Sequence, residues 1–204
     1  MEKPKEDFIP EQEQGSKMDA VETRNFNTLI EAEELFTVAG DRLRSVNQWA
    51  AYSGISEFKL FDSGGDHVSR KAEIGDYIRI DIPGPGTAAG GGFDWVHIED
   101  IQTEQTETSN QIAMRVRPCS NPLNDHAEVA HFLKSDATST FIVKRTGTLV
   151  SAEEHGRNEM PNAGEGSLAD RSRNLLVGIA AKVGFSYPQW KLLVKGLLEP
   201  ASSS

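Results

Sequence analysis

The chain has 204 residues, of which 31 are acidic and 21 are basic, so its formal net charge is −10. This length suits one domain with its own core. The negative charge, without a clustered basic patch, argues against nucleic acids and anionic membrane surfaces as partners. A single cysteine excludes an internal disulfide and is typical of a reducing compartment.

The N-terminal segment is rich in Glu, Lys, Gln and Pro and contains no apolar run of the kind found in secretory signals. We therefore expect a cytoplasmic protein without a membrane span. Composition predicts a disordered acidic tail over residues 1–20, a single domain over residues 21–199 and a disordered end over residues 200–204. Alternatively, Phe8 and Ile9 in the tail anchor a protein partner.

Helical periodicity opens the predicted domain. In the segment LIEAEELFTVAGDRL the apolar residues recur at helical spacing, and we expect Gly40 to end this helix. A second, short helix is expected from an N-cap at Ser45 to Gly54, with Val46 and Trp49 on one side.

From Glu57 onward the apolar period changes to two, which is typical of strands. Six strands are predicted, in the segments FKLFD, DYIRIDIP, FDWVHIEDIQTEQT, NQIAMRVRP, TSTFIVKRTG and TLVSAEEHGRNE. Because most of the links are short, we expect an antiparallel meander. The long link from Cys119 to Ala137 is the exception, and its apolar spacing predicts a short helix over one end of the sheet.

Two further apolar stripes at helical spacing follow the strands. The first covers residues 175–183, after a shortened capping box formed by Ser167 and Asp170. The second consists of Trp190, Leu193, Val194, Leu197 and Leu198. We therefore predict an α+β protein, with a curved antiparallel sheet of six or seven strands packed against N-terminal and C-terminal helices. A small antiparallel β-barrel with flanking helices is the alternative.

The loop GPGTAAGGG between two of the predicted strands is rich in glycine but does not fit a phosphate cradle. It contains no Lys, is flanked by Asp81 and Asp94, and leads into a strand rather than a helix. A long hairpin with residues at positive φ is expected. The alternative is a loop that covers a ligand.

Alternation along the strands predicts a sheet with two unlike faces. The aliphatic face is expected to carry Ile78, Ile80, Ile82, Asp94, Val96, Ile98, Asp100, Ile112, Met114 and Val116. The opposite, mixed face is either wet or, if the sheet curls, the wall of a cavity. In the second case the ligand-binding residues would be Arg79, Trp95, His97, Glu99, Arg115 and Arg117.

A weaker candidate site lies in the segment AEEHGRNEMPN. His155, Arg157 and Glu159 alternate there, so a proton-transfer residue, an anion clamp and a carboxylate would share one strand face. A polar strand end explains the same spacing, so these three are minor candidates for catalysis.

Metal, cofactor and nucleophile motifs are not found in the sequence. His126 and His131 lack the paired ligands of a metal site, and we expect no metal and no cofactor. Cys119 follows a proline and has no neighbouring His, so it does not resemble a catalytic nucleophile.

The order of elements and the segment VETRNFNTLIEAEELFTVAGDRLRSVNQWAAYSG resemble the helix-grip fold of START-like and Bet v 1-like carriers of lipids and hydrophobic ligands. The resemblance implies that VETRNFN is a first strand and that the sheet curls around the terminal helix to form a cavity. A break at residues 184–188 and the polar strand positions depart from that pattern. The chain also resembles an uncharacterised bacterial family without an assigned activity.

Three functions are open at this point. The first is a non-enzymatic binding protein with a partly polar pocket or sheet face for a small ligand. The second is an accessory protein that docks on a larger assembly through its tail and C-terminal helix, which an exposed stripe of Trp190, Leu193 and Leu197 would favour. The third is a hydrolase-like enzyme using His155 and Glu159, which a cleft converging on His155 would favour.

Overall fold

A computed structural model of the protein describes residues 8–54, 56–82, 89–125, 127–162, 184 and 187–200. Seven antiparallel strands form one sheet in the order β1-β7-β6-β5-β4-β3-β2. They are β1 (Ser16–Asn25), β2 (Glu57–Phe61), β3 (Tyr77–Asp81), β4 (Asp94–Gln105), β5 (Ser109–Pro118), β6 (Thr138–Thr146) and β7 (Leu149–Glu159). The six predicted strands and their antiparallel order are confirmed. Because β1 and β2 are the edges, the sheet is open and is not the alternative barrel.

The connection from β1 to β2 contains α1 (Leu29–Arg44), η1 (Val46–Gln48) and α2 (Ala50–Ser53). Thr28 caps α1, because its Oγ1 accepts from the Glu31 N–H at 3.3 Å while the Glu31 carboxylate accepts from the Thr28 N–H at 3.1 Å. The prediction that Gly40 ends the helix is wrong. Gly40 is the point where α1 approaches the sheet, since a Cβ there would lie 2.5 Å from Ile112 Cδ1. Gly54 ends α2 at a φ of 68°, as expected.

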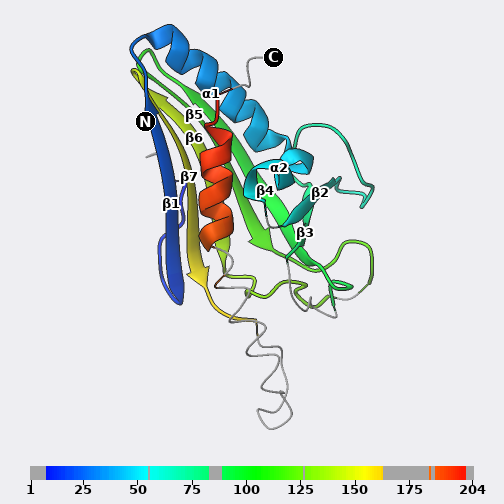
Figure 1. The fold of residues 1–204 in the computed structure, drawn as a ribbon. Helices are drawn as coiled ribbons and strands as arrows, with labels where there is room; N and C mark the ends of the chain where they lie inside the picture. Colours follow the sequence, from blue (N-terminus) through cyan, green and yellow to red (C-terminus); the bar gives the residue numbers. More distant parts are fainter. Residues whose placement is uncertain are drawn as a thin grey trace, which may run out of the picture.

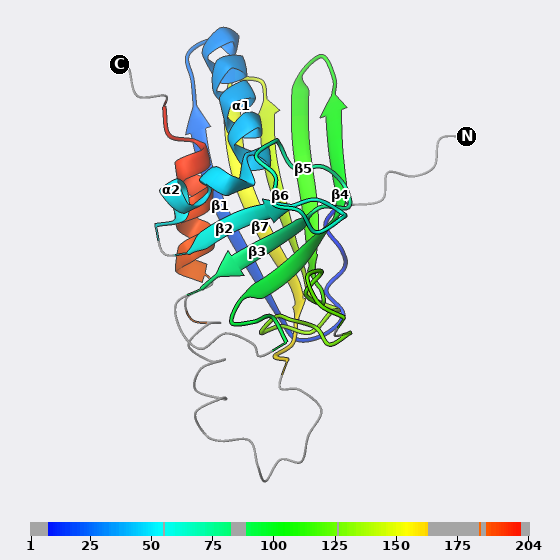
Figure 2. The ribbon, with the colours of Figure 1, turned by 90° about the vertical axis from the view of Figure 1, so that its right-hand side faces the viewer.

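The same face of the sheet is covered by α1 and by the C-terminal helix, residues 187–197 (Figure 1). We call it the covered face and the opposite one the outer face. Figure 2 shows the twist of the sheet, in which β2 and β3 run across the direction of β1 and β7. The main core between sheet and helices includes Leu35, Leu43, Trp49, Ile78, Ile80, Val96, Met114, Phe141 and Leu193. This arrangement is α+β and helix-grip-like, as predicted.

The segment before α1 differs from the predicted tail. The expectation of disorder through residue 20 is wrong from Ser16 onward, because β1 begins there and pairs with β7. Phe8 is buried against Ala113 and Ile142 on the outer face, so it is not available as the exposed anchor that the sequence suggested. The first seven residues and the last four lie outside the described residues.

The predicted helix in the link between β5 and β6 is also wrong. The described residues of the link form turns and isolated bridges, one of them between Leu133 and Pro161. Asn121 starts a local turn in which its Oδ1 accepts from the Leu123 N–H at 2.9 Å. The Trp95 N–H then donates to the Ala130 carbonyl at 2.8 Å, so the link extends the pairing of β4 instead of coiling.

The C-terminal stripe of Trp190, Leu193, Val194, Leu197 and Leu198 is buried in the main core, as its spacing predicted. Arg42 of α1 holds the end of this helix, since its Nη1 donates to the Leu197 carbonyl at 3.1 Å. The stripe predicted over residues 175–183, with its cap at Ser167 and Asp170, lies outside the described residues. Within the described part of the chain, no helix has the length and apolar character needed to cross a bilayer.

Candidate functional site

Three of the six predicted ligand residues form an ion-pair cluster on the outer face. Arg115 Nε donates to Glu99 Oε2 at 3.1 Å, and Arg117 Nε donates to Glu99 Oε1. Burial tends to raise the pKa of Glu99, but the two guanidinium groups outweigh it and hold the pKa below its usual value. Arg115 also lies over the ring of Phe8, 5.3 Å from the ring centroid. One carboxylate therefore pairs with two guanidinium groups, so the cluster keeps one positive charge.

The other three predicted residues are engaged in aromatic contacts on the same face. The Arg79 guanidinium lies 4.1 Å from the ring centroid of Phe93. Trp95 is 1% exposed and packs against Phe61, with ring centroids 5.1 Å apart, and His97 packs against Tyr77. The structure thus brings all six residues to one face. None of them lines the cavity described below.

A β-bulge in β4 changes which residues share a face. The register shifts between Ile98 and Asp100, so that Asp100 lies opposite Arg115 and Ile101 lies opposite Met114. The prediction that Asp100 belongs to the aliphatic face is therefore wrong. Ile101 takes the core-facing position instead, packed against the main core.

A second irregularity, near the end of β7, separates the predicted catalytic trio. Asn158 has a φ of 57°, and the pairing of β7 with β1 shifts at this point. Glu159 therefore turns to the covered face, where its carboxylate lies over Gly156: a Cβ on that glycine would be 2.5 Å from Glu159 Oε1. His155 and Arg157 stay on the outer face, so the prediction that Glu159 shares a face with them is wrong.

On the outer face, His155 lies between two carboxylates. Its Nδ1 is 2.6 Å from Asp19 Oδ1 and its Nε2 is 2.9 Å from Glu153 Oε2, and Arg157 Nη2 lies 2.8 Å from the same Asp19 oxygen. Burial tends to lower the pKa of His155, but the hydrogen bonds to Glu153 and Asp19 outweigh it and raise the pKa. This cluster holds β1 to β7, and His155 does not face the cavity described next.

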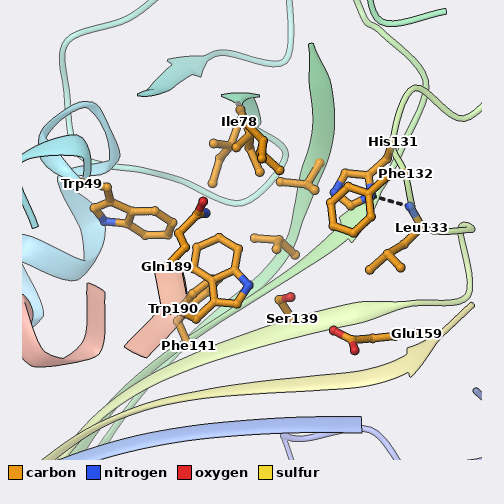
Figure 3. Close-up of a pocket in the computed structure, with 14 residues that line it drawn as sticks. Trp49, Ile78, His131, Phe132, Leu133, Ser139, Phe141, Glu159, Gln189 and Trp190 are labelled. Atoms are coloured by element: carbon orange, nitrogen blue, oxygen red, sulfur yellow. Dashed lines mark hydrogen bonds between the residues drawn. The ribbon is translucent and has the colours of Figure 1, made fainter. Parts of the chain in front are cut away.

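The strongest candidate site lies on the covered face, near the end of β7. A cavity of about 30 Å³ lies there between the sheet, the β5–β6 link and the C-terminal helix (Figure 3). An adjoining groove of about 290 Å³ shares Phe132, Leu133 and Glu159 with it. We call the cavity and the groove together the hollow. Its walls include Trp49, Ile78, Ile80, Val96, Phe132, Leu133, Phe141 and Trp190, with His131, Ser139, Glu159 and Gln189 as polar members.

Gln189 places an unsatisfied amide in the cavity wall. Its side chain is 1% exposed, and its Oε1 accepts from the Ser56 hydroxyl. Its Nε2 has no hydrogen-bond partner within the described part of the chain. Figure 3 shows the indole nitrogen of Trp190 turned toward Ser139, on the side of the cavity from which Glu159 points inward. Polar groups thus occur at both ends of an otherwise aromatic and aliphatic space.

A second carboxyl lies close to Glu159. Glu154 is fully buried on the covered face, paired across the strands with Ala20 and Phe141. Neither of its oxygens has a hydrogen-bond partner of good geometry among the described residues. Burial, followed by the charge of Glu159, raises the pKa of Glu154 well above its usual range, and Ser139 offsets this only in part. Burial likewise raises the pKa of Glu159. We call Glu154 and Glu159 the carboxyl pair.

Other reactive groups are less suited to chemistry. Burial raises the pKa of the Cys119 thiol to about 12, so it is a poor nucleophile at neutral pH. The described residues contain no group of three or more His, Cys, Asp or Glu side chains arranged to hold a metal ion. His131 Nδ1 accepts from the Leu133 N–H at 2.9 Å, and His126 lies outside the described residues.

The fold and the hollow define an α+β protein of helix-grip-like arrangement with a partly polar internal site. It is similar to a hypothetical protein from Helicobacter pylori, at 11% identity over 87% of this chain and 86% of that one, with a TM-score of 0.44. Norcoclaurine synthase from Thalictrum flavum is similar at 11% identity over 93% and 99% of the two chains, with a TM-score of 0.35. An uncharacterised protein from Bacillus thuringiensis is similar at 14% identity over 89% and 100%, with a TM-score of 0.36.

These likenesses carry no argument about function, since every score is below 0.5. No protein-family pattern and no curated protein matches the sequence.

Proposed function

We propose that the protein is a non-enzymatic binding protein that takes a small molecule into the hollow. The observation that carries this proposal is the Nε2 group of Gln189, a buried donor without an acceptor in the wall of a cavity. Leaving such a donor unpaired costs about 1–3 kcal/mol, so a ligand oxygen that accepts from it stabilises the complex. Aromatic and aliphatic walls around a few polar groups are typical of small-molecule sites.

The dimensions indicate how a ligand would lie. The cavity of about 30 Å³ holds only a polar end group or a few atoms, whereas the groove of about 290 Å³ accommodates a larger body. Phe132 and Leu133 line both spaces, so they would contact the apolar part of the ligand at the junction.

The other two functions have less support. Trp190, Leu193 and Leu197 are buried in the core, so they do not form the exposed stripe that docking through the C-terminal helix requires. His155 lies on the outer face, where Asp19 and Glu153 engage both of its ring nitrogens, and it lines neither the cavity nor the groove.

Native mass spectrometry of the protein purified from its own host tests the proposal. We expect a retained small molecule in the wild type and its loss in Ser139→Leu, whose larger side chain fills the cavity. Lys144→Leu is the matched control, because Lys144 is exposed on the same strand and lies on the outer face. The proposal fails if the wild type retains nothing and no compound of a broad metabolite and lipid panel raises its melting temperature.

A further inference from the structure

The polar groups of the hollow indicate the class of its ligand. Resting on the proposed function, we infer that the ligand carries a cationic group, an ammonium or a guanidinium, that binds to Glu159 of the carboxyl pair, at the junction of the cavity and the groove. The same ligand carries an oxygen acceptor at its other end, where Gln189 Nε2 lacks a partner.

The carboxyl pair is gathered around Gly156. Glu154 lies two positions before Gly156 on the covered face. Ser139 on β6 is the cross-strand partner of Gly156. The carboxylate of Glu159 fits above it only because the glycine has no Cβ, which would lie 2.5 Å from Glu159 Oε1. Glu159 lines both the cavity and the groove, and Ser139 lines the cavity, whereas Glu154 is fully buried and lines neither space.

The carboxyl pair forms no ion pair among the described residues, although the charge of Arg157 lowers the pKa of both members. None of the ion pairs formed by the described residues includes Glu154 or Glu159. Ser16 Oγ donates to Glu159 Oε2 at 3.2 Å and is a neutral partner. A buried carboxylate without a cation is costly, so a ligand cation would supply the missing counter-charge.

The charged and titratable groups on the surrounding elements support this assignment. Lys17 of β1 lies at the exposed rim of the groove, together with Tyr187 of the C-terminal helix. From the β5–β6 link, His131 lines the cavity. Asp19 raises the pKa of Glu154 and Arg157 lowers it, but these two lie on the outer face and are paired with each other.

Binding of a cation also changes the protonation of the carboxyl pair. Burial raises the pKa of both groups, and the charge of Glu159 raises the pKa of Glu154 further. A cation beside Glu159 lowers these pKa values again, so its binding releases protons that the pair holds. A neutral ligand leaves the protons in place.

Three probes with the same ring and different charge test the inference: cyclohexylmethylamine, cyclohexylmethanol and cyclohexanecarboxylate. Isothermal titration calorimetry near neutral pH gives their affinities, and the dependence of the heat on the buffer gives the protons released. We expect the amine to bind on the order of tenfold more tightly than the alcohol, with proton release, and the carboxylate to bind most weakly.

Variants of the carboxyl pair test whether these two residues cause the preference for the amine and the proton release. Glu154→Gln should reduce both the preference for the amine and the proton release, because it removes the second buried carboxyl. Glu159→Gln, which removes the carboxyl that lines the hollow, should bring amine and alcohol to similar affinities and abolish proton release. This result decides the test if Glu154→Gln does not fold. Glu153→Gln is the matched control, because Glu153 is adjacent on β7 and lies on the outer face, so the preference for the amine should persist.

The outcomes separate the two proposals. An alcohol that binds as tightly as the amine contradicts a cationic ligand and leaves the proposed function standing. An amine preference that survives in both Gln variants contradicts the role of the carboxyl pair. If none of the three probes binds at millimolar concentration, the cationic ligand is contradicted, and the proposed function is decided by native mass spectrometry and the metabolite and lipid panel.

Discussion

At the scale of single residues, His155 joins two strands, because its ring bridges Asp19 of β1 and Glu153 of β7. Its pKa is raised above 6.5, so its contribution to stability is complete below pH 6.5 and is lost as the pH rises through the raised value. The hydrogen bond from His155 holds the pKa of Glu153 below 4.5, so that contribution is present above pH 4.5 and is lost on acidification. The cluster therefore stabilises the fold most between pH 4.5 and pH 6.5.

We predict that His155→Gln lowers the free energy of unfolding most in that interval. The expected loss is about 1 kcal/mol, since Asp19 is partly exposed and solvent weakens its share. Urea unfolding of both proteins across a pH series measures it. The difference between them should shrink as the pH rises above the pKa of His155, and a difference that does not vary with pH would contradict this account.

Single residues also account for the errors in assigning faces to side chains. Strict alternation along β7 would place the side chains of Glu159 and His155 on the same face. Asn158 adopts a left-handed conformation, however, which turns Glu159 to the opposite face. Asn158 Oδ1 accepts from the Glu13 N–H at 2.8 Å and the Gln14 N–H at 3.2 Å. These partners lie far away in the sequence, so the strand pattern alone does not predict the bulge.

At the scale of elements, the contact of α1 with β5 depends on Gly40. Glycine inside a helix costs about 1 kcal/mol relative to alanine. In this helix a methyl group would lie 2.5 Å from Ile112 Cδ1, so the gain in helix propensity is offset by the clash.

A double-mutant cycle tests this contact. We predict that Gly40→Ala alone destabilises the protein by about 1 kcal/mol. In the background of Ile112→Val, which lacks the clashing methyl group, the same change should stabilise by about 1 kcal/mol. Denaturant unfolding of the four proteins gives the coupling energy, and equal effects of Gly40→Ala in both backgrounds would exclude a role for Ile112.

Elements with a regular apolar period could be predicted from the sequence. Elements whose path depends on pairing with residues distant in the sequence could not. The six strands from β2 to β7 follow from alternation and turn residues. The start of β1 at Ser16 did not, because an edge strand is half exposed and the polar letters before residue 21 resemble a tail. In the β5–β6 link, apolar spacing indicated a helix, but the turn at Asn121 and the bridge from Leu133 to Pro161 determine its path.

At the scale of the whole molecule, the two unlike sheet faces were predictable, but the position of the hollow was not. The hollow exists only where the C-terminal helix, the β5–β6 link and the end of β7 meet, and no local pattern places three such segments together. Glu154 was missed because it stands in the polar run AEEHGRNE. Its parity with Ala152 was the available signal, since both then face the core.

The C-terminal helix closes the covered face, so its buried stripe should govern the stability of the whole domain. Leu193 is fully buried in the core, whereas its neighbour Leu192 is 42% exposed. We predict that Leu193→Ala lowers the free energy of unfolding by about 3 kcal/mol, through lost burial and the cavity left behind. Leu192→Ala should change it by less than about 0.5 kcal/mol.

Denaturant unfolding measured by fluorescence and by circular dichroism checks both variants. Because the helix shares one core with the sheet, the two signals should shift together for Leu193→Ala, with the slope of the transition unchanged. A transition that splits, so that the helical signal is lost before the sheet unfolds, would mean that the helix docks as a separate unit. The hollow would then open without unfolding of the sheet, which would give a ligand a route of entry.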